Sequence, residues 1–393
     1  MRIITIILSC MLSFCAGLLL FAIHYEWILF RLPATTKITT RSCTTKRTIA
    51  IEYWKSNSPC REYREIVWST HPVQQAACII SNYLSLIESE GIITNHSTLQ
   101  TVATDRATTT LICSLSHNPF DLESSTQQSL YIIEGLLSTI RAACPQFKQL
   151  ILLINQHQLL HPHFDFSQPW PMTGFLSTSS SMPIPQSKKP SPSAEPIIMI
   201  HPSGDTHRVG RTIGDAFERT ITTQLAHALK QEMGQIDNSI RVIISRTLGE
   251  TGESLGLARI VHRIRPTIVI HLSAYYQSCT TPEIALCIFC LHPNTDSWSR
   301  KKSHSLLPYY YAHLTACTLN HYYATMLQQQ LHNNHCPATI PHSTAFPYAP
   351  LIGVQYPAIA LEIGIHEPSD ILLLIPSLAQ ALVHSVTLRT VHP

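Results

Sequence analysis

The sequence predicts an α/β protein. We expect its C-terminal half to form a mainly parallel sheet flanked by helices, preceded by a small α/β domain and an N-terminal transmembrane helix. Two observations lead to this class. From residue 48 onward, short apolar runs alternate with amphipathic stretches of helical spacing, a pattern typical of parallel sheets covered by helices. A long uncharged apolar run precedes them at the N-terminus.

The composition excludes some classes of protein. The 393 residues suffice for two or three domains, and 45% hydrophobic with 13% charged residues indicates a chain that forms cores. The formal charge of +3 is small for this length, so we expect no nucleic-acid partner. Because the chain holds 22 histidines, one histidine alone does not mark a site.

Residues 1–30 are expected to be a signal anchor. After Arg2, the run "IITIILSCMLSFCAGLLLFAI" is long enough to cross a bilayer as a helix, which needs about 20 residues. No A-x-A-like cleavage site follows, and Tyr25 and Trp27 suit the membrane interface. A cleaved signal peptide is the alternative. The rest of the chain is therefore expected in the periplasm, anchored in the inner membrane.

The twelve cysteines predict no compact disulfide framework, although an oxidising compartment would permit disulfides. Cys10 or Cys15 as a lipoprotein cysteine fits the neighbouring bulky residues poorly. Cys287 and Cys290, in "ALCIFCL", lie in an apolar run that reads as a strand. Because positions three apart on a strand face opposite sides, we expect buried thiols there and not a metal pair.

Residues 172–196 are rich in Ser, Pro and Lys and are expected to be a linker between two domains. In the first domain, residues 48–171, apolar runs predict strands and helical spacing predicts two helices. The expected strands are 48–54, 108–116 and 149–155, and the expected helices are 72–91 and 124–144.

The first domain resembles the germination–sporulation (GerM-type) domain of bacterial envelope proteins. The resemblance rests on "HNPFDLESSTQQSLYIIEGLLSTI", "CPQFKQLILLIN" and "HFDFSQPWP" in this order. His163, Asp165, Ser167 and Pro169 fit the closing H-x-D-x-S-x-P of that family. The resemblance implies a scaffold or interaction role and no chemistry. A generic α/β domain is the alternative.

The second domain, residues 197–393, again alternates strands and helices. Because sites in such sheets lie beyond the carboxyl ends of the strands, His201, His271 and Glu362 are the candidates, together with Glu218 at a helix start. The expected strands are 195–202, 239–246, 266–276 and 357–364, and the expected helices are 215–233, 253–264, 306–332 and 376–388.

Each candidate also has a purely structural interpretation. Glu218 follows Asp215 at the D-x-x-E spacing of a capping box. His271 fits a core histidine bonded to the backbone. Glu362 stands in the apolar run "PAIALEIG" and fits an ion pair with an arginine such as Arg246, since an unpaired buried carboxylate is costly.

This domain resembles the zinc-dependent N-acetylmuramoyl-L-alanine amidases over about residues 197–385. Four blocks occur in family order: "IIMIHPSGDT", "FERTITTQLAHAL", "IVIHLSAY" and "PAIALEIGI". The resemblance implies that Glu218 and His271 bind Zn²⁺ and that Glu362 is the catalytic base. The zinc-activated water would then cleave the amide between N-acetylmuramic acid and the L-alanine of the stem peptide in peptidoglycan.

The first block departs from the family. Its zinc histidine falls on Gly204, which has no side chain to bind a metal. His207 is the expected third ligand and His201 the alternative, because catalytic zinc ordinarily has three protein ligands. Three functions stay open: a peptidoglycan hydrolase, a different zinc-dependent amide hydrolase that uses the same residues, or an inactive amidase-like protein that binds wall fragments or envelope partners. The aromatic-rich segment 305–335 is a candidate autoinhibitor of the cleft.

Overall fold

The computed structural model divides the chain into two compact units, Met1–Cys43 and Thr44–Pro393. The structure describes residues 11, 13–17, 45–105, 107, 109–176, 195–246, 256–290, 309–341 and 343–391. Within the expected anchor, residues 11 and 13–17 are helical, and the remainder lies outside the described residues. Most of the expected linker, 177–194, lies outside them as well.

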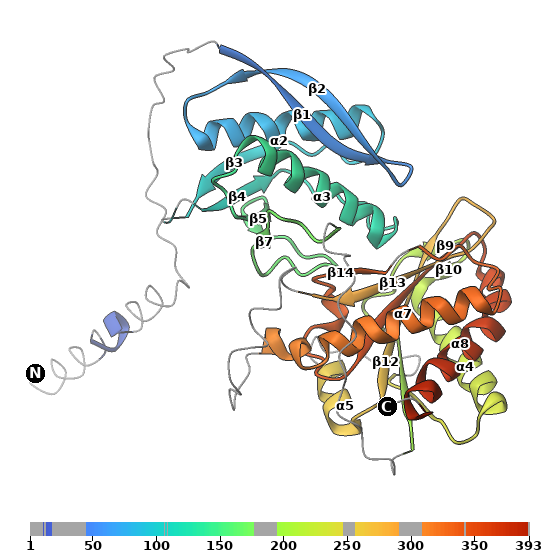
Figure 1. Cartoon of the computed structure of the whole chain (residues 1–393). Coiled ribbons are helices and arrows are strands. Elements are labelled where there is room, and N and C mark those ends of the chain that lie inside the picture. Colours follow the sequence, from blue (N-terminus) through green and yellow to red (C-terminus); the bar gives the residue numbers. More distant parts are fainter. Residues whose placement is uncertain are drawn as a thin grey trace, which may run out of the picture. The chain divides into compact units, whose positions relative to one another are not determined.

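The described residues between 45 and 176, here the N-terminal lobe, form a hairpin, two helices and a small sheet (Figure 1). The hairpin turns at Ser56 and Asn57, which both adopt the left-handed conformation. In the sheet, β4 and β5 are parallel, and β3, β6 and β7 pair antiparallel at its edges. The elements are β1 (Thr45–Lys55), β2 (Ser58–Trp68), α2 (Pro72–Ser89), β3 (Leu99–Thr104), β4 (Thr110–Leu115), α3 (Thr126–Ala143), β5 (Gln149–Ile154), β6 (His157–Gln158) and β7 (Trp170–Pro171).

The described residues between 195 and 391, here the C-terminal lobe, contain a six-stranded sheet in the order β11-β8-β12-β15-β13-β14. Its neighbours are parallel except β13 and β15, so the expected mainly parallel sheet is confirmed. The strands are β8 (Ile197–Pro202), β9 (Thr212–Ile213), β10 (Ala216–Phe217), β11 (Arg241–Ile244), β12 (Ile268–Tyr276), β13 (Glu283–Phe289), β14 (Thr344–Phe346) and β15 (Ala358–Ile365). The helices are α4 (Glu218–Ile236), α5 (Gly256–Ile264), η2 (Tyr309–Thr315), α7 (Cys317–Asn333), η3 (Ala349–Leu351), η4 (Pro368–Asp370) and α8 (Ile371–Val391).

The two faces of this sheet bury different partners, because successive side chains of a strand point to opposite faces. On β15, Ile359, Leu361 and Ile363 pack in one core with apolar residues of α4, α7 and α8. Ala358 and Ala360 belong instead to the core that contains the apolar interior of the N-terminal lobe. Glu362 has the same parity as these alanines and therefore lies on the face toward the N-terminal lobe.

Main-chain contacts also join the two lobes. The amide of Asp165 donates to the carbonyl of Pro347 over 2.9 Å, and the amide of Ala349 donates to the carbonyl of His163 over 2.9 Å. Between them, Phe164 and Tyr348 form an antiparallel bridge. The "HFDFSQPWP" segment of the first domain thus pairs with the chain that follows β14.

Two further expectations meet the structure in the C-terminal lobe. Cys287 is a buried free thiol and Cys290 is buried as well, as the strand pattern predicted. The described part of the candidate autoinhibitor, segment 305–335, contributes to two different places. Tyr323 and Leu327 of α7 are buried in the core on the other face of the sheet, whereas Tyr309 of η2 lines the cavity described below. The helix α7 therefore does not cover that cavity.

One helix within the described residues, Pro368–Thr387, is long and apolar enough for a membrane span, and half of its most apolar window is buried in the protein.

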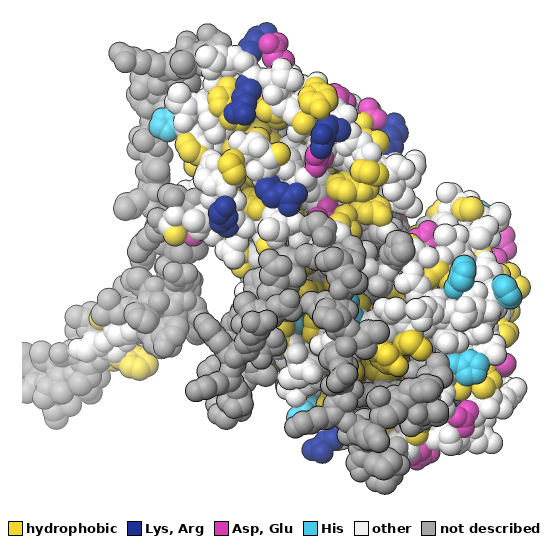
Figure 2. Space-filling model, in the orientation of Figure 1, with side chains coloured by type: hydrophobic (Ala, Val, Ile, Leu, Met, Phe, Trp, Pro, Cys, Tyr) yellow, Lys and Arg dark blue, Asp and Glu magenta, His cyan; other side chains and the backbone are white. Residues whose placement is uncertain are grey.

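Surface charges of the N-terminal lobe are paired, as in Lys46–Glu65 at 3.0 Å and Lys55–Glu90 at 2.7 Å. On the face that Figure 2 draws, basic side chains lie beside acidic ones. Such exposed pairs add little stability.

Candidate functional site

Glu362 lies in the middle of β15, opposite Ser273 of β12, and its side chain is fully buried. Three donors bind its carboxylate. The Thr126 amide lies 3.0 Å from both oxygens, and the Thr126 hydroxyl lies 2.5 Å from Oε1. The third donor is Nη2 of Arg211, 2.8 Å from Oε1. Glu362 therefore does not face an open cleft from the end of a strand. It does form an ion pair with an arginine, but that arginine is Arg211 and not Arg246, the example that the sequence suggested.

Glu218 is the first residue of α4 and is also buried, with 1% of its surface exposed. Its Oε1 accepts a hydrogen bond from the amide of Ala274 over 3.1 Å, and its Oε2 accepts one from the amide of Arg211 over 3.1 Å. The residue that caps the helix is Phe217, and it makes no side-chain capping bond. The suggested capping box of Asp215 and Glu218 is therefore wrong, because Glu218 turns inward to backbone donors.

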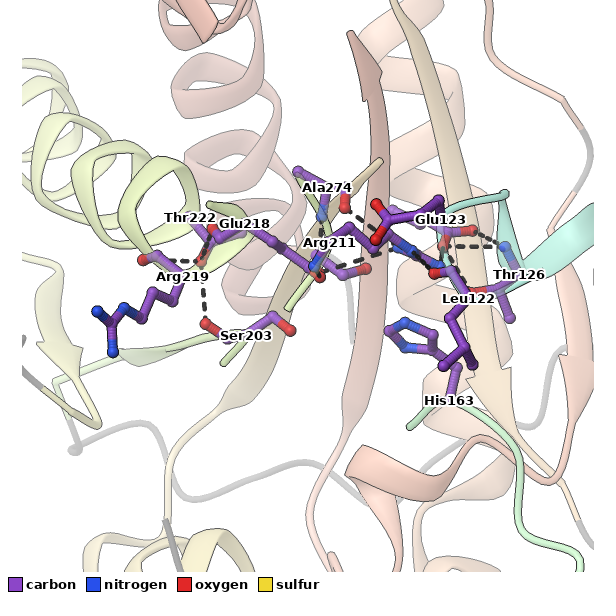
Figure 3. A network of polar contacts seen from close by, with 12 residues as sticks. Leu122, Glu123, Thr126, His163, Ser203, Arg211, Glu218, Arg219, Thr222 and Ala274 are labelled. Carbon is purple, nitrogen blue, oxygen red and sulfur yellow. Dashed lines mark hydrogen bonds and ion pairs between the residues drawn. The ribbon is translucent and has the colours of Figure 1, made fainter. Parts of the chain in front are cut away.

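Arg211 joins Glu218 and Glu362, and Figure 3 shows it beside Glu218. It is 4% exposed, and its Nη1 lies 3.9 Å from Oε1 of Glu218. It also donates to the carbonyls of Leu122 and Ala274, both at 3.1 Å, and to the hydroxyl of Thr126 at 3.2 Å. Burial opposes the charge of the guanidinium, but Glu362 and Glu218 outweigh burial and raise the pKa of Arg211 above its ordinary value.

Both carboxylates also lie at helix N-termini. Glu218 occupies the first turn of α4, and Glu362 accepts the amide proton of Thr126, the first residue of α3. Unpaired amides at a helix start carry about half a positive charge. Glu362 thus binds the start of α3 and one guanidinium, whereas the first amides of α4, those of Glu218 and Arg219, donate to the carbonyls of Arg211 and Val209. Below, Thr126, Arg211, Glu218 and Glu362 are called the Arg211 cluster.

His271 lines the same cavity as Arg211 and Glu218 and lies beside His201 on the neighbouring strand, with 5.2 Å between the ring centroids. Burial and then His201 hold the pKa of His271 well below its usual range, and burial lowers the pKa of His201 to about 3. Nδ1 of His201 lies 2.7 Å from Oγ of Ser245. Within the described part of the chain, neither ring nitrogen of His271 has a hydrogen-bond partner. These imidazoles are therefore neutral at physiological pH.

The remaining candidate ligand, His207, is exposed on the loop after β8. Its amide donates to Oδ1 of Asp205 over 2.8 Å, which shapes the loop. Gly204, where the resembled family has a histidine, adopts φ +76°. A Cβ atom there would lie 2.6 Å from Cβ of Arg219. The loop is therefore built around a residue without a side chain.

The residues present do not fit a metal ion. Among the described residues, no three histidine, cysteine, aspartate or glutamate side chains converge so that they could hold one. The fold brings Glu218 and Glu362 together on a guanidinium, which already supplies the positive charge between them. It leaves His271 with His201 and leaves His207 at the surface.

A cavity of about 880 Å³ lies next to the Arg211 cluster. Residues from both lobes line it, including His161 and His163 from the N-terminal lobe and His201 and His271 from the C-terminal sheet. Its charged lining contains Arg208, Arg211, Arg246 and Arg259 together with Glu123, Asp205 and Glu218. This is a volume that suits a small polar molecule or the end of a chain.

Sequence reasoning missed Arg211 and Thr126. A signal existed for Arg211, since two buried glutamates require a cation and the loop "HPSGDTHRVGR" offers one at its end. For Thr126 the signal was the helix start in "ESSTQQ", because the first amides of a helix bind anions. Neither signal states which carboxylate is bound, since Thr126 and Glu362 are 236 positions apart.

No family model matches the chain, and no curated protein matches it. Solved amidase structures are similar to about half of it. Ami1 from Mycobacterium abscessus, an N-acetylmuramyl-L-alanine amidase in its apo form, is 15% identical with a TM-score of 0.37, over 50% of this chain and 99% of that chain. AmiC2 of Nostoc punctiforme is 13% identical with a TM-score of 0.35, over 50% and 97%. The catalytic domain of CwlV from Bacillus (Paenibacillus) polymyxa var. colistinus is 10% identical with a TM-score of 0.35, over 49% and 96%. These scores are too low for the likeness to assign a family or an activity.

Proposed function

We propose that this chain is an amidase-like protein of the cell envelope that binds peptidoglycan fragments in the cavity beside the Arg211 cluster and does not hydrolyse them. The N-terminal apolar run would anchor it in the inner membrane, with both lobes in the periplasm. Among the functions that the sequence left open, the proposal selects the inactive amidase-like protein.

The state of Glu362 carries this proposal. A general base must reach the proton that it removes, directly or through one water molecule. Both oxygens of Glu362 are instead bound by the Thr126 amide, and Oε1 also by the Thr126 hydroxyl and by Arg211. The side chain is fully buried, so no surface remains for a substrate water. Hydrolysis would require this carboxylate to leave all of its partners.

The cavity lining favours an anionic ligand. Oε2 of Glu123 accepts the amide proton of Thr212 over 2.8 Å, and Oδ1 of Asp205 accepts those of His207 and Arg208. Glu218 belongs to the Arg211 cluster. The lining acids thus accept hydrogen bonds from the protein itself. Arg208, Arg246 and Arg259 line the same space, and the guanidinium of Arg246 also donates to the carbonyl of Pro202. Guanidinium groups bind carboxylates well, and the stem peptides of peptidoglycan carry carboxylates.

The first experiment separates binding from hydrolysis. Purified sacculi are incubated with the full chain, with added Zn²⁺ or with EDTA, and released stem peptides are quantified by mass spectrometry. We expect no release above the level without protein in either condition. Zinc-dependent release that Glu362→Gln abolishes would instead establish the amidase.

The second experiment measures binding of a soluble disaccharide carrying a stem peptide, using calorimetry in EDTA. We expect Arg259→Met, at the cavity wall, to weaken binding at least tenfold. Arg241→Met is the matched control, because Arg241 is exposed at the start of β11 and does not line the cavity. Equal affinities of the two variants, or no binding by the unchanged protein, would refute the proposed function.

A further inference from the structure

We infer that Arg211 acts as an internal cation that fastens the N-terminal lobe to the C-terminal lobe, so that the two lobes form one cooperative unit without a metal ion. This inference concerns how the protein holds its cavity together. It does not depend on the ligand proposed above, because every contact it uses lies within the chain.

The charges explain why the position needs a cation. Glu218 and Glu362 are both buried, and two carboxylates that share one guanidinium would repel each other without it. Arg211 supplies one positive charge, and the start of α3 adds about half a charge where the Thr126 amide binds Glu362. A divalent ion at the same place would repel the guanidinium. The side chain of Arg211 therefore supplies the positive charge that a metal ion could supply at this place.

The same guanidinium reaches across to the N-terminal lobe. Its Nε donates to the carbonyl of Leu122 over 3.1 Å, and its Nη2 donates to the hydroxyl of Thr126 over 3.2 Å (Figure 3). One residue further on, the amide of Thr212 donates to Oε2 of Glu123. Residues 122–126, which lead into α3, thus contact the guanidinium, the chain after it and Glu362.

The contacts depend on one another. Thr126 binds Glu362 with its amide and its hydroxyl, and the hydroxyl also accepts a proton from Arg211. Removing the guanidinium leaves Glu362 fully buried, and its remaining donors among the described residues, the amide and hydroxyl of Thr126, belong to the other lobe. A buried charge that loses its partner is strongly destabilising, and here the cost falls on both lobes together.

A second junction gives the inference a sharp prediction. The main-chain contacts between 163–165 and 347–349 involve no side chain of the Arg211 cluster. Loss of Arg211 should therefore open the lobes at the start of α3 and leave the other junction closed. If Arg211 stabilised only its own loop, its loss would leave α3 unchanged.

The test is hydrogen exchange, followed peptide by peptide, in the full chain kept in EDTA. We expect Arg211→Met to speed exchange at least tenfold in peptides that cover the first turn of α3 and in those that cover β15. We expect Thr126→Val, which removes only the shared hydroxyl, to do the same at both places by about threefold, so the test survives if Arg211→Met does not fold. Arg241→Met is the surface control and should change neither.

The inference would be overturned if either variant sped exchange only in residues 205–218, with the start of α3 unchanged. It would equally be overturned if EDTA alone loosened α3 and β15 in the unchanged protein, because a metal would then share the role assigned to Arg211. Neither result depends on whether the disaccharide peptide binds. Failure of this inference can therefore be distinguished from failure of the proposed function.

Discussion

Nη2 of Arg211 lies 2.8 Å from Oε1 of Glu362, although the two residues are 151 positions apart and both are almost entirely buried. The pair connects the loop after β8 with the middle of β15. Its energetic role follows from burial, because removing one partner strands the other charge in a medium of low polarity.

The first prediction concerns that pair. We expect Arg211→Met to lower the free energy of unfolding by about 3–5 kcal/mol, the range for breaking a buried ion pair. The double variant Arg211→Met with Glu362→Leu should recover part of this loss, since no unpaired carboxylate remains. Urea unfolding followed by circular dichroism measures both. If the double variant is no more stable than the single one, the stranded charge is not the cause.

The second prediction concerns metal. Because the Arg211 cluster is neutralised by protein groups, we expect the melting temperature to be the same in EDTA and in excess Zn²⁺. A ligand that binds only the folded state at 100 times its dissociation constant would add about 2.7 kcal/mol, which is easily seen as a shift. A clear rise in melting temperature with zinc, accompanied by stoichiometric metal content, would contradict the geometry.

Much of the C-terminal lobe could be predicted from the sequence, because its signals are local. The apolar run around Glu362 is β15, and the helical spacing after Asp215 is α4. His271 lies on β12 beside His201 on β8, but it is the fourth of the nine residues of β12 and not near the carboxyl end that the sequence suggested. The assignment of Glu362 as a catalytic base, which the resemblance implied, stays a prediction.

The partners of the buried carboxylates could not be predicted in the same way. Local periodicity shows that Glu362 is in an apolar strand, but not that its partners come from residues 126 and 211. Such contacts depend on how two lobes pack. The resemblance to the amidases predicts a histidine where this chain has Gly204. It does not predict that a guanidinium lies between Glu218 and Glu362.

The third prediction concerns pH. Glu134 of α3 is 6% exposed, and its Oε1 accepts the amide proton of Phe175 over 2.5 Å. Burial raises the pKa of Glu134 to about 7, from 4.5 in the unfolded chain. The folded state therefore holds this proton more tightly, and the stability it contributes is complete below pH 4.5 and is lost as pH rises to about 7.

The measurement compares the unchanged protein with Glu134→Gln, which keeps an acceptor for Phe175 and cannot ionise. The difference in unfolding free energy between the two should change by on the order of 3 kcal/mol across this pH range. The comparison is needed because His161 and His201, whose pKa values burial lowers to about 3, give the opposite slope on the acid side. A difference that stays constant with pH would show that folding does not shift the pKa of Glu134.

The last prediction asks whether the histidine of the resembled family can be restored. Gly204 has φ +76°, a conformation that costs most other residues about 1–2 kcal/mol. Any Cβ there would also meet Cβ of Arg219 at 2.6 Å and the carbonyl oxygen of Arg208 at 2.9 Å. We therefore expect Gly204→His to destabilise the protein, without gaining zinc, since Arg211 still neutralises the nearby glutamates.

Gly204→Ala is the matched control, because it carries the same backbone strain and the same Cβ contact without an imidazole. Melting temperatures of both variants should fall by similar amounts, and atomic absorption should find zinc in neither. Stoichiometric zinc in Gly204→His but not in Gly204→Ala would mean that the loop and Arg211 can move aside. The Arg211 cluster would then be one of two states that this chain can adopt, and the proposal of binding without hydrolysis would hold only for the state without metal.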